Sequence, residues 1–240
     1  MIRIFLVIVL TTILNTSLFA GDTAQRNIIG FSYDGSWFAF EEFGTSDGSG
    51  APYSNIYVVN VNNDEWAKGT PIRVNFGETV ALISKARDKA MQQARQILDK
   101  LEIKEPGNLL ASTPVTEISA NPRRIDFYRN KNLNDPAHKL SYVLKEIDFP
   151  ENPTCKSFGV KEKGFSLSLT KGGSPLTLVF KDKSIPSSRN CPMRYEISDV
   201  IEFNPSAAPS RHVILVHMFS IGFEGPDSRF LAVPVTQPYK

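Results

Sequence analysis

The sequence has few of the residues that dominate metal and acid–base sites, with only two cysteines and three histidines in 240 residues. It also lacks the G-x-S-x-G, H-E-x-x-H, P-loop and G-x-G-x-x-G motifs of common enzymes. A formal net charge of +2 gives no electrostatic reason to expect binding to nucleic acid or to an anionic membrane. The sequence therefore predicts no catalytic residue, no cofactor and no metal ligand.

Long apolar runs are also missing after the N-terminus, which itself has the layout of a secretory signal peptide. Arg3 supplies the positive charge, residues 4–19 are mainly apolar, and the chain turns polar after Ala20. Because polar residues interrupt this short apolar segment, it is a poor membrane-spanning helix, and an uncleaved anchor is the alternative. We expect a signal peptide over 1–20 and a secreted or periplasmic protein whose residues 21–240 form a single domain.

The two cysteines, Cys155 and Cys191, have no C-x-x-C spacing and no neighbouring histidine that would suggest a metal site. An exported chain meets an oxidising compartment, where an even pair of cysteines forms a disulfide. The sequence thus predicts a Cys155–Cys191 disulfide. The chain-entropy model gives a loop of about 36 residues roughly 4 kcal/mol of stabilisation.

Short apolar runs rich in β-branched and aromatic residues predict strands along most of the mature chain. In the first part, 21–76, they form a β-meander, in which Asp34-Gly35 is a strong hairpin signal. In the last part, 123–240, a turn at 171–175 separates two of the runs. The predicted strands are 28–32, 37–43, 55–61, 71–76, 124–128, 140–149, 164–170, 176–181, 195–203, 212–223 and 229–235.

Residues 78–102 have a different pattern, with apolar residues at spacings of three and four. This pattern predicts a long amphipathic helix within 77–106, and its alanine-rich face suggests close packing on a sheet or another helix. Pro106-Gly107 ends it. Residues 107–122 have little periodicity and are interpreted as a connecting arm.

The predicted fold class is α+β, mostly antiparallel β in meanders and hairpins, with one long amphipathic helix. The alternative is a distorted, small β-propeller-like fold, because 31–61 reads like one propeller blade. Ile29-Gly30-Phe31 has an echo in Ile221-Gly222-Phe223, but no period runs through the chain between them. We interpret the echo as two similar hairpins, adjacent in one sheet, which would bring the ends of the mature chain side by side.

Several residues are of the types found in functional sites, but their spacing and neighbours favour structural roles. His212 and His217 are five positions apart on a strand, so they point to opposite faces and cannot share a metal. Glu41 and Glu42 face opposite sides for the same reason. Asp47 is the lone carboxylate of a Gly-rich loop, which favours a flexible hairpin loop over a calcium site.

Arg189 lies two residues before Cys191, so a disulfide would hold it rigidly. A guanidinium in that position can form a fork onto a carboxylate. We expect Arg189 or Arg229 to pair with Glu224 or Asp227 and to fasten loops together.

Four strings, FSYDGSWFAFEEFG, DGSGAPYS, SRNCP and GFEGPDSRF, resemble those of a family of uncharacterised bacterial proteins with a domain of unknown function, labelled as predicted secreted proteins. The resemblance covers nearly the whole mature chain. It implies export and one family-wide domain, and it supplies no activity. Separately, FSYDGSWFAF resembles the blade repeat of periplasmic TolB-like propellers over a single hairpin.

Two functional hypotheses follow. The first is a non-enzymatic exported protein of the cell envelope that binds or scaffolds an envelope or periplasmic protein partner through its β surface. The second is an exported hydrolase or carbohydrate-binding enzyme whose carboxylates come from separate strands.

Overall fold

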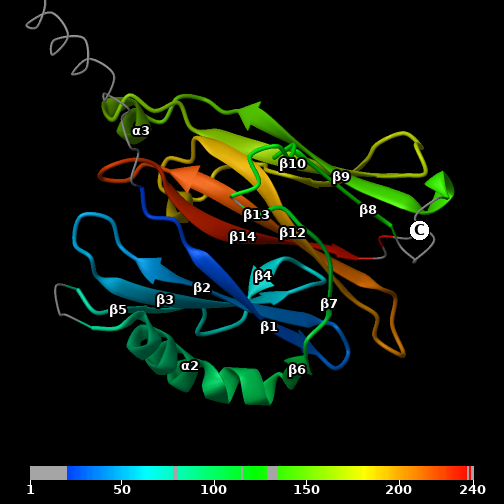
Figure 1. The fold of residues 1–240 in the computed structure, drawn as a ribbon, viewed down its shortest axis with the longest axis horizontal. Coiled ribbons are helices and arrows are strands. Elements are labelled where there is room, and N and C mark those ends of the chain that lie inside the picture. The colour runs from blue at the N-terminus through cyan, green and yellow to red at the C-terminus, as the bar shows by residue number, and fades with distance from the viewer. Residues whose placement is uncertain (1–20, 78–80, 115, 129–134, 237, 239–240) are drawn as a thin grey trace, which may run out of the picture.

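The computed structural model describes residues 21–77, 81–114, 116–128, 135–236 and 238. The expected signal peptide, 1–20, lies outside the described residues. Three antiparallel sheets and one long helix, α2 (Ile83–Lys100), form a layered stack (Figure 1). The predicted α+β fold class is confirmed, and the propeller alternative is wrong because the sheets lie in layers instead of around an axis.

We name the three sheets by their place in the stack. The N-terminal sheet has the order β4-β3-β2-β1-β6, with β5 also paired to β3. The middle sheet has the order β14-β13-β12-β7, and the outer sheet has the order β11-β10-β9-β8. Their strands are β1 (Gln25–Ser32), β2 (Trp37–Thr45), β3 (Pro52–Asn60), β4 (Glu65–Trp66), β5 (Ile72–Asn75), β6 (Ile103–Glu105), β7 (Asn108–Ser112), β8 (Arg124–Tyr128), β9 (Lys139–Asp148), β10 (Lys163–Lys171), β11 (Thr177–Lys181), β12 (Arg194–Phe203), β13 (Arg211–Ser220) and β14 (Asp227–Thr236).

Helix α2 covers the outside of the N-terminal sheet, as its alanine-rich face predicts. Ala86, Ala90 and Ala94 are fully buried and pack in one cluster with Ile56 and Val58 of β3. Small side chains let the helix backbone approach the sheet closely, while the charged residues of the helix face solvent. This layer leaves the other face of the N-terminal sheet free to pack on the middle sheet.

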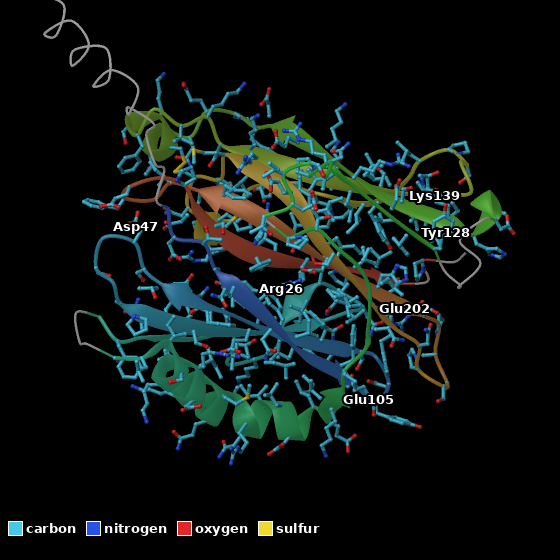
Figure 2. The ribbon with its side chains drawn as sticks, viewed as in Figure 1. Arg26, Asp47, Glu105, Tyr128, Lys139 and Glu202 are labelled. Carbon is cyan, nitrogen blue, oxygen red and sulfur yellow. A yellow bond between two sulfur atoms is a disulfide. The ribbon has the colours of Figure 1, made fainter. Side chains whose placement is uncertain are left out.

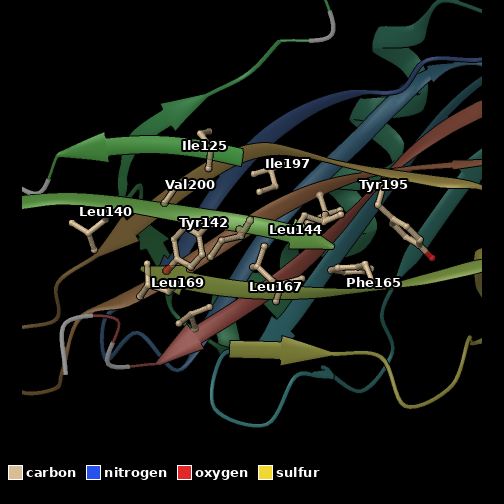
Figure 3. Packing of buried hydrophobic residues seen from close by; sticks show 14 of the residues in the cluster. Ile125, Leu140, Tyr142, Leu144, Phe165, Leu167, Leu169, Tyr195, Ile197 and Val200 are labelled. Atoms are coloured by element: carbon tan, nitrogen blue, oxygen red, sulfur yellow. The ribbon is translucent and has the colours of Figure 1, made fainter. Parts of the chain in front are cut away.

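The middle sheet is covered on both faces. Nine of the ten β13 residues are buried, and its sequence HVILVHMF is the nearly continuous apolar run expected of a strand with no solvated face. Toward the outer sheet, Ile214 and Val216 join the cluster that Figure 3 shows around Tyr142 and Leu167. Toward the N-terminal sheet, Val213 and Leu215 join a second cluster.

The strand predictions agree with the structure apart from end positions, but six short elements were missed. They are β4, β6, β7, the helix α3 (Pro153–Ser157) and the 3-10 helices η1 (Pro136–His138) and η2 (Ser187–Arg189). Strand β7 lies within 107–122, so that segment is partly an edge strand of the middle sheet and not only a connecting arm. Such short elements carry too few residues to show a period.

The two echoing hairpins lie in different sheets, so the expectation that they share a sheet is wrong. The Asp34-Gly35 hairpin joins β1 to β2, whereas the second joins β13 to β14. The start of the mature chain lies beside the start of β14, because Thr23 forms an isolated parallel bridge with Ser228. Thr236 lies at the other end of this ten-residue strand, so the expectation that the two ends of the mature chain lie side by side is wrong as well.

The predicted disulfide between Cys155 and Cys191 is present, with an S–S distance of 2.11 Å and a Cα–Cα distance of 5.4 Å. It joins α3 to the residues after the 3-10 helix η2 (Ser187–Arg189). This crosslink holds η2 beside the outer sheet, which matters for the site described below.

The stack has two flanks that differ in their covalent connection. On the connected flank the chain runs from edge strand β6 to edge strand β7 to edge strand β8 (Figure 1). On the open flank the edges are β4, β14 and β11, which do not follow one another in sequence.

Candidate functional site

A groove runs along the open flank beside β14. One cavity, of about 370 Å³, is lined by residues 230–233, and a second, of about 440 Å³, by residues 234–236. Consecutive residues of a strand point to opposite faces, so cavities that touch all of them must lie at the strand's edge. Asp64 lines both cavities, which makes them one continuous feature that we call the flank groove.

The floor of the flank groove is the unpaired backbone edge of β14. The backbone of Ser228 bonds to residues 22 and 24, and the Phe230 N–H donates to a Glu42 carboxylate oxygen at 2.9 Å. Both residues therefore direct their backbone groups away from β13. Since the pairing with β13 has no bulge, Ala232 and Pro234 share that orientation.

The N-terminal half of this edge is thus occupied, and the C-terminal half is open. Among the described residues, the Ala232 N–H has no hydrogen-bond partner. Pro234 has no N–H to satisfy, which is typical of proline on an edge strand. The open backbone is therefore confined to the part that lies in the flank groove.

The wall formed by the N-terminal sheet is built on a buried carboxylate. Glu42 is fully buried and accepts hydrogen bonds from Asn55 Nδ2 at 2.9 Å and from the Tyr57 hydroxyl at 2.8 Å, in addition to the Phe230 N–H. Burial raises the pKa of Glu42, and its hydrogen bonds act in the opposite direction. Burial likewise raises the pKa of Tyr57 well above its usual value. This network fixes the Tyr57 ring in the groove wall.

Aromatic rings and one carboxylate line the mouth of the groove. Tyr57 and Trp66 meet edge to face with 6.2 Å between ring centroids, and about half of the Trp66 side chain is exposed. Asp64, at the turn before β4, has a left-handed backbone (φ 57°), and its carboxylate has no hydrogen-bond or ion-pair partner among the described residues. Loss of hydration raises the pKa of Asp64 to about 6, although the side chain still reaches solvent.

The opposite wall comes from β11 and η2 and is held by Arg189. The Arg189 guanidinium forms a fork onto the Asp182 carboxylate at 2.8 and 2.9 Å and also donates to the Tyr195 hydroxyl. The predicted fork is present, but its carboxylate is Asp182 and not Glu224 or Asp227. The expected Arg229–Asp227 ion pair is present at 4.0 Å, and Arg229 also has a closer partner, Asp22, at 2.7 Å.

A further cavity, of about 350 Å³, lies near the connected flank and is lined in part by Glu117, Glu196 and His217. Hydrogen bonds from Ser119 lower the pKa of Glu117, the opposite of what a general acid requires. Glu196 is paired with Arg194 at 3.3 Å. His217 is buried, and its Nε2 has no hydrogen-bond partner among the described residues.

The two histidines of β13 and the two adjacent glutamates of β2 each point to opposite faces of their strand, as their spacing predicts. His212 contacts Tyr142 of the outer sheet, whereas His217 packs against Phe230, on the side of the N-terminal sheet. Glu41 pairs with Arg87 of α2 and Glu42 faces β14, so the two adjacent glutamates do point to opposite sides.

No group of three metal-ligating side chains occurs within the described part of the chain. In the loop proposed as the less favoured calcium site, the Asp47 carboxylate accepts a hydrogen bond from the Glu224 N–H at 2.6 Å. The flank groove was not predicted from the sequence. Its one local signal was the exposed Asn-Asn-Asp turn before Trp66.

The fold and the groove define a class: a β-rich protein of three stacked antiparallel sheets with one covering helix and an aromatic groove at an open sheet edge. The chain belongs to the family described as "Predicted secreted protein (DUF2259)", whose model matches residues 39–236. The suspected family is therefore confirmed, and the match includes the β14 edge and both walls of the groove. No curated protein and no solved structure matches the chain. Among the described residues, no helix combines the length and the apolar character needed to cross a membrane.

Proposed function

We propose that the protein is a non-enzymatic exported component of the cell envelope that binds a partner protein in the flank groove. The family description supports export, and the N-terminal sequence supports cleavage of residues 1–20. The observation that carries the binding role is the groove itself, in which an unpaired strand edge lies between two walls that contain aromatic side chains, the half-exposed Trp66 among them. Edge strands are normally blocked or covered, so a strand edge left open in a groove is a natural place for a partner.

The distribution of carboxylates favours binding over hydrolysis. Asp64 is the one carboxylate among the described residues that line the two cavities of the flank groove, and acid–base hydrolysis of glycosides uses a pair. The cavity near the connected flank does contain two glutamates, but Glu117 has a lowered pKa and Glu196 is paired with Arg194. Neither arrangement supports the hydrolase hypothesis.

The experiment is site-specific photocrosslinking in cells that export the protein. A photoreactive amino acid replaces Trp66 or Leu178 in the groove walls, and Tyr33, which is 66% exposed in the β1–β2 turn, is the matched control position. We expect a discrete crosslinked product from the groove positions and none from the control. Equal crosslinking from all three positions, or none from the groove, contradicts the proposal.

A further inference from the structure

The flank groove differs from an ordinary apolar cleft because its floor is a row of backbone groups. Ala232 directs both its N–H and its C=O into the groove, and the N–H has no partner among the described residues. The open stretch also offers the Pro234 C=O, two residues further along the same edge. A small ligand could use one such group, whereas an extended chain matches backbone groups that repeat every second residue along a strand. The floor therefore favours a peptide in the β conformation.

The walls fit such a strand. The N-terminal sheet and the outer sheet lie on opposite sides of the middle sheet, and both contribute residues to the same cavity beyond the edge of β14. A strand added to β14 would extend the middle sheet, and its side chains would alternate between the two walls. Tyr57 and Trp66 would meet one set of side chains, and Phe180 the other.

Charge complementarity specifies the partner further. The Asp64 carboxylate is unpaired among the described residues, and it lies beside two electron-rich rings, Tyr57 and Trp66. The cation on the opposite wall, Arg189, forms its fork onto Asp182 and makes no hydrogen bond with Asp64, although its charge partly offsets the rise in the pKa of Asp64 that burial causes. The Arg73 guanidinium lies 5.9 Å from the Trp66 ring centroid, so this ring already attracts a cation within the chain.

We infer that the partner is an extended peptide segment that pairs with the open edge of β14 at Ala232 and places a lysine or arginine side chain against Asp64 and the neighbouring aromatic rings. This inference rests on the proposed function and adds the chemical class of the partner. The peptide supplies backbone hydrogen bonds for affinity, and its basic side chain supplies specificity.

The test measures binding of synthetic ten-residue peptides of alternating threonine and valine to the mature protein by calorimetry. The central residue is lysine, glutamate or norleucine, and a fourth peptide carries the lysine but has N-methylated backbone amides along one edge. We expect the lysine peptide to bind at least about tenfold more tightly than the glutamate peptide, because an unpaired carboxylate attracts one and repels the other. The peptide with a methylated edge should lose binding while the protein remains unchanged.

Two variants locate the site. Asp64→Asn should weaken the lysine peptide about fivefold and leave the norleucine peptide unaffected, while Asp88→Asn on α2 is the matched control and should change neither. Hydrogen exchange should show the Ala232 amide protected when the lysine peptide is bound. This readout reports strand pairing directly and does not depend on a substitution in β14.

The possible results separate this inference from the proposed function. Equal binding of lysine and glutamate peptides overturns the basic partner, and an Ala232 amide that stays unprotected overturns strand pairing. If no peptide binds at millimolar concentration while the groove positions still crosslink a partner in cells, this inference is wrong and the proposed function stands. If the groove positions do not crosslink, the proposed function fails as well.

Discussion

On the connected flank, the chain itself passes from β6 to β7 to β8, so each edge strand continues directly into the edge of the next sheet. On the open flank, no such connection joins β4, β14 and β11. The walls of the flank groove are held there by side-chain contacts. Arg26 of β1, labelled in Figure 2, forms an ion pair with Asp199 of β12 and donates to Ser112 of β7, which fastens the connected flank. On the open flank, η2 is held by Arg189 and by the disulfide.

This difference has a physical meaning. Proteins protect a sheet edge by keeping the edge strand short or by blocking it with side chains. On the connected flank, β6 and β7 have three and five residues, whereas β14 on the open flank has ten. Glu42 blocks the β14 edge at Phe230 but not at Ala232. The two flanks should therefore respond differently to substitution: the connected flank in stability, the open flank in binding.

The largest expected effect is on the connected flank, from Arg26→Met. The substitution leaves the fully buried Asp199 carboxylate without its cation, and a buried charge that loses its partner costs about 4 kcal/mol of unfolding free energy. For a protein of this size the melting temperature should fall by roughly 10 °C. Arg95→Met, on the exposed face of α2, is the control. A melting temperature equal to that of the control would show that the Asp199 pair does not fasten the flank.

On the open flank, Arg189→Met should also destabilise, by about 3 kcal/mol in urea unfolding, because Asp182 is buried and loses both bonds of its fork. Each carboxylate keeps one hydrogen bond, Asp182 from the Phe165 N–H and Asp199 from the Ser198 hydroxyl. We expect a smaller effect than at Arg26 because Asp182 is slightly exposed and Asp199 is not. An unchanged urea midpoint would mean that the disulfide alone holds this wall.

Acid should weaken the interface between the N-terminal and middle sheets through His217. Burial lowers its pKa to about 4, with Arg26 and Arg194 acting in the same direction and Asp199 opposing them. The unfolded chain binds a proton at this histidine near pH 6.5, and the folded protein does not. The contribution of neutral His217 to the free energy of unfolding is therefore fully present above pH 6.5, and about 3 kcal/mol is lost as the pH drops to about 4. The test measures the free energy of unfolding in urea from pH 7 to 4 for the protein and for His217→Leu. If both depend on pH in the same way, His217 is not the cause of the acid sensitivity.

The turn that closes the connected flank should be sensitive to one methyl group. Gly107 joins β6 to β7 with φ 69°, and a Cβ there would lie 2.8 Å from the Phe31 ring and 3.0 Å from the Glu202 carbonyl oxygen. Gly107→Ala should cost about 2 kcal/mol, from backbone strain plus the clash. Gly173→Ala, with φ 78° and open space around it, isolates the strain and should cost about 1 kcal/mol. Thermal unfolding measures the loss of stability in both variants. If Gly107→Ala and Gly173→Ala lose the same amount, the clash contributes nothing.

The smallest effect on stability is expected from Trp66→Ala in the flank groove, below about 1 kcal/mol, because the side chain is half exposed on a two-residue strand. The matched substitution on the connected flank, Phe31→Ala, removes a fully buried ring and should cost about 3 kcal/mol or more. Chemical unfolding measures both. A large loss at Trp66 would mean that this ring supports the fold and is not free for a partner.

Local patterns account for the parts of the fold that were predicted correctly. The spacing of Ala86, Ala90 and Ala94 identified both the helix and its packing face, and the two-residue period of strands separated His212 from His217. The short strands β6 and β7 escaped prediction because they pair with β1 and β12, which are distant in sequence, and β4 escaped because two residues show no period. Asp182 and Asp22 escaped as the partners of Arg189 and Arg229 because charge alone does not select among the available carboxylates.

By itself, the sequence determined the class of fold, the long helix, the disulfide between Cys155 and Cys191 and the opposite orientation of Glu41 and Glu42, because each follows from local periodicity or chemistry. Only the tertiary structure decided which edges of the three sheets meet. The open stretch of β14 at Ala232, the unpaired Asp64 and the aromatic walls come from three separate parts of the chain. These parts come together only because the three sheets pack on one another, and a local sequence pattern does not determine that packing.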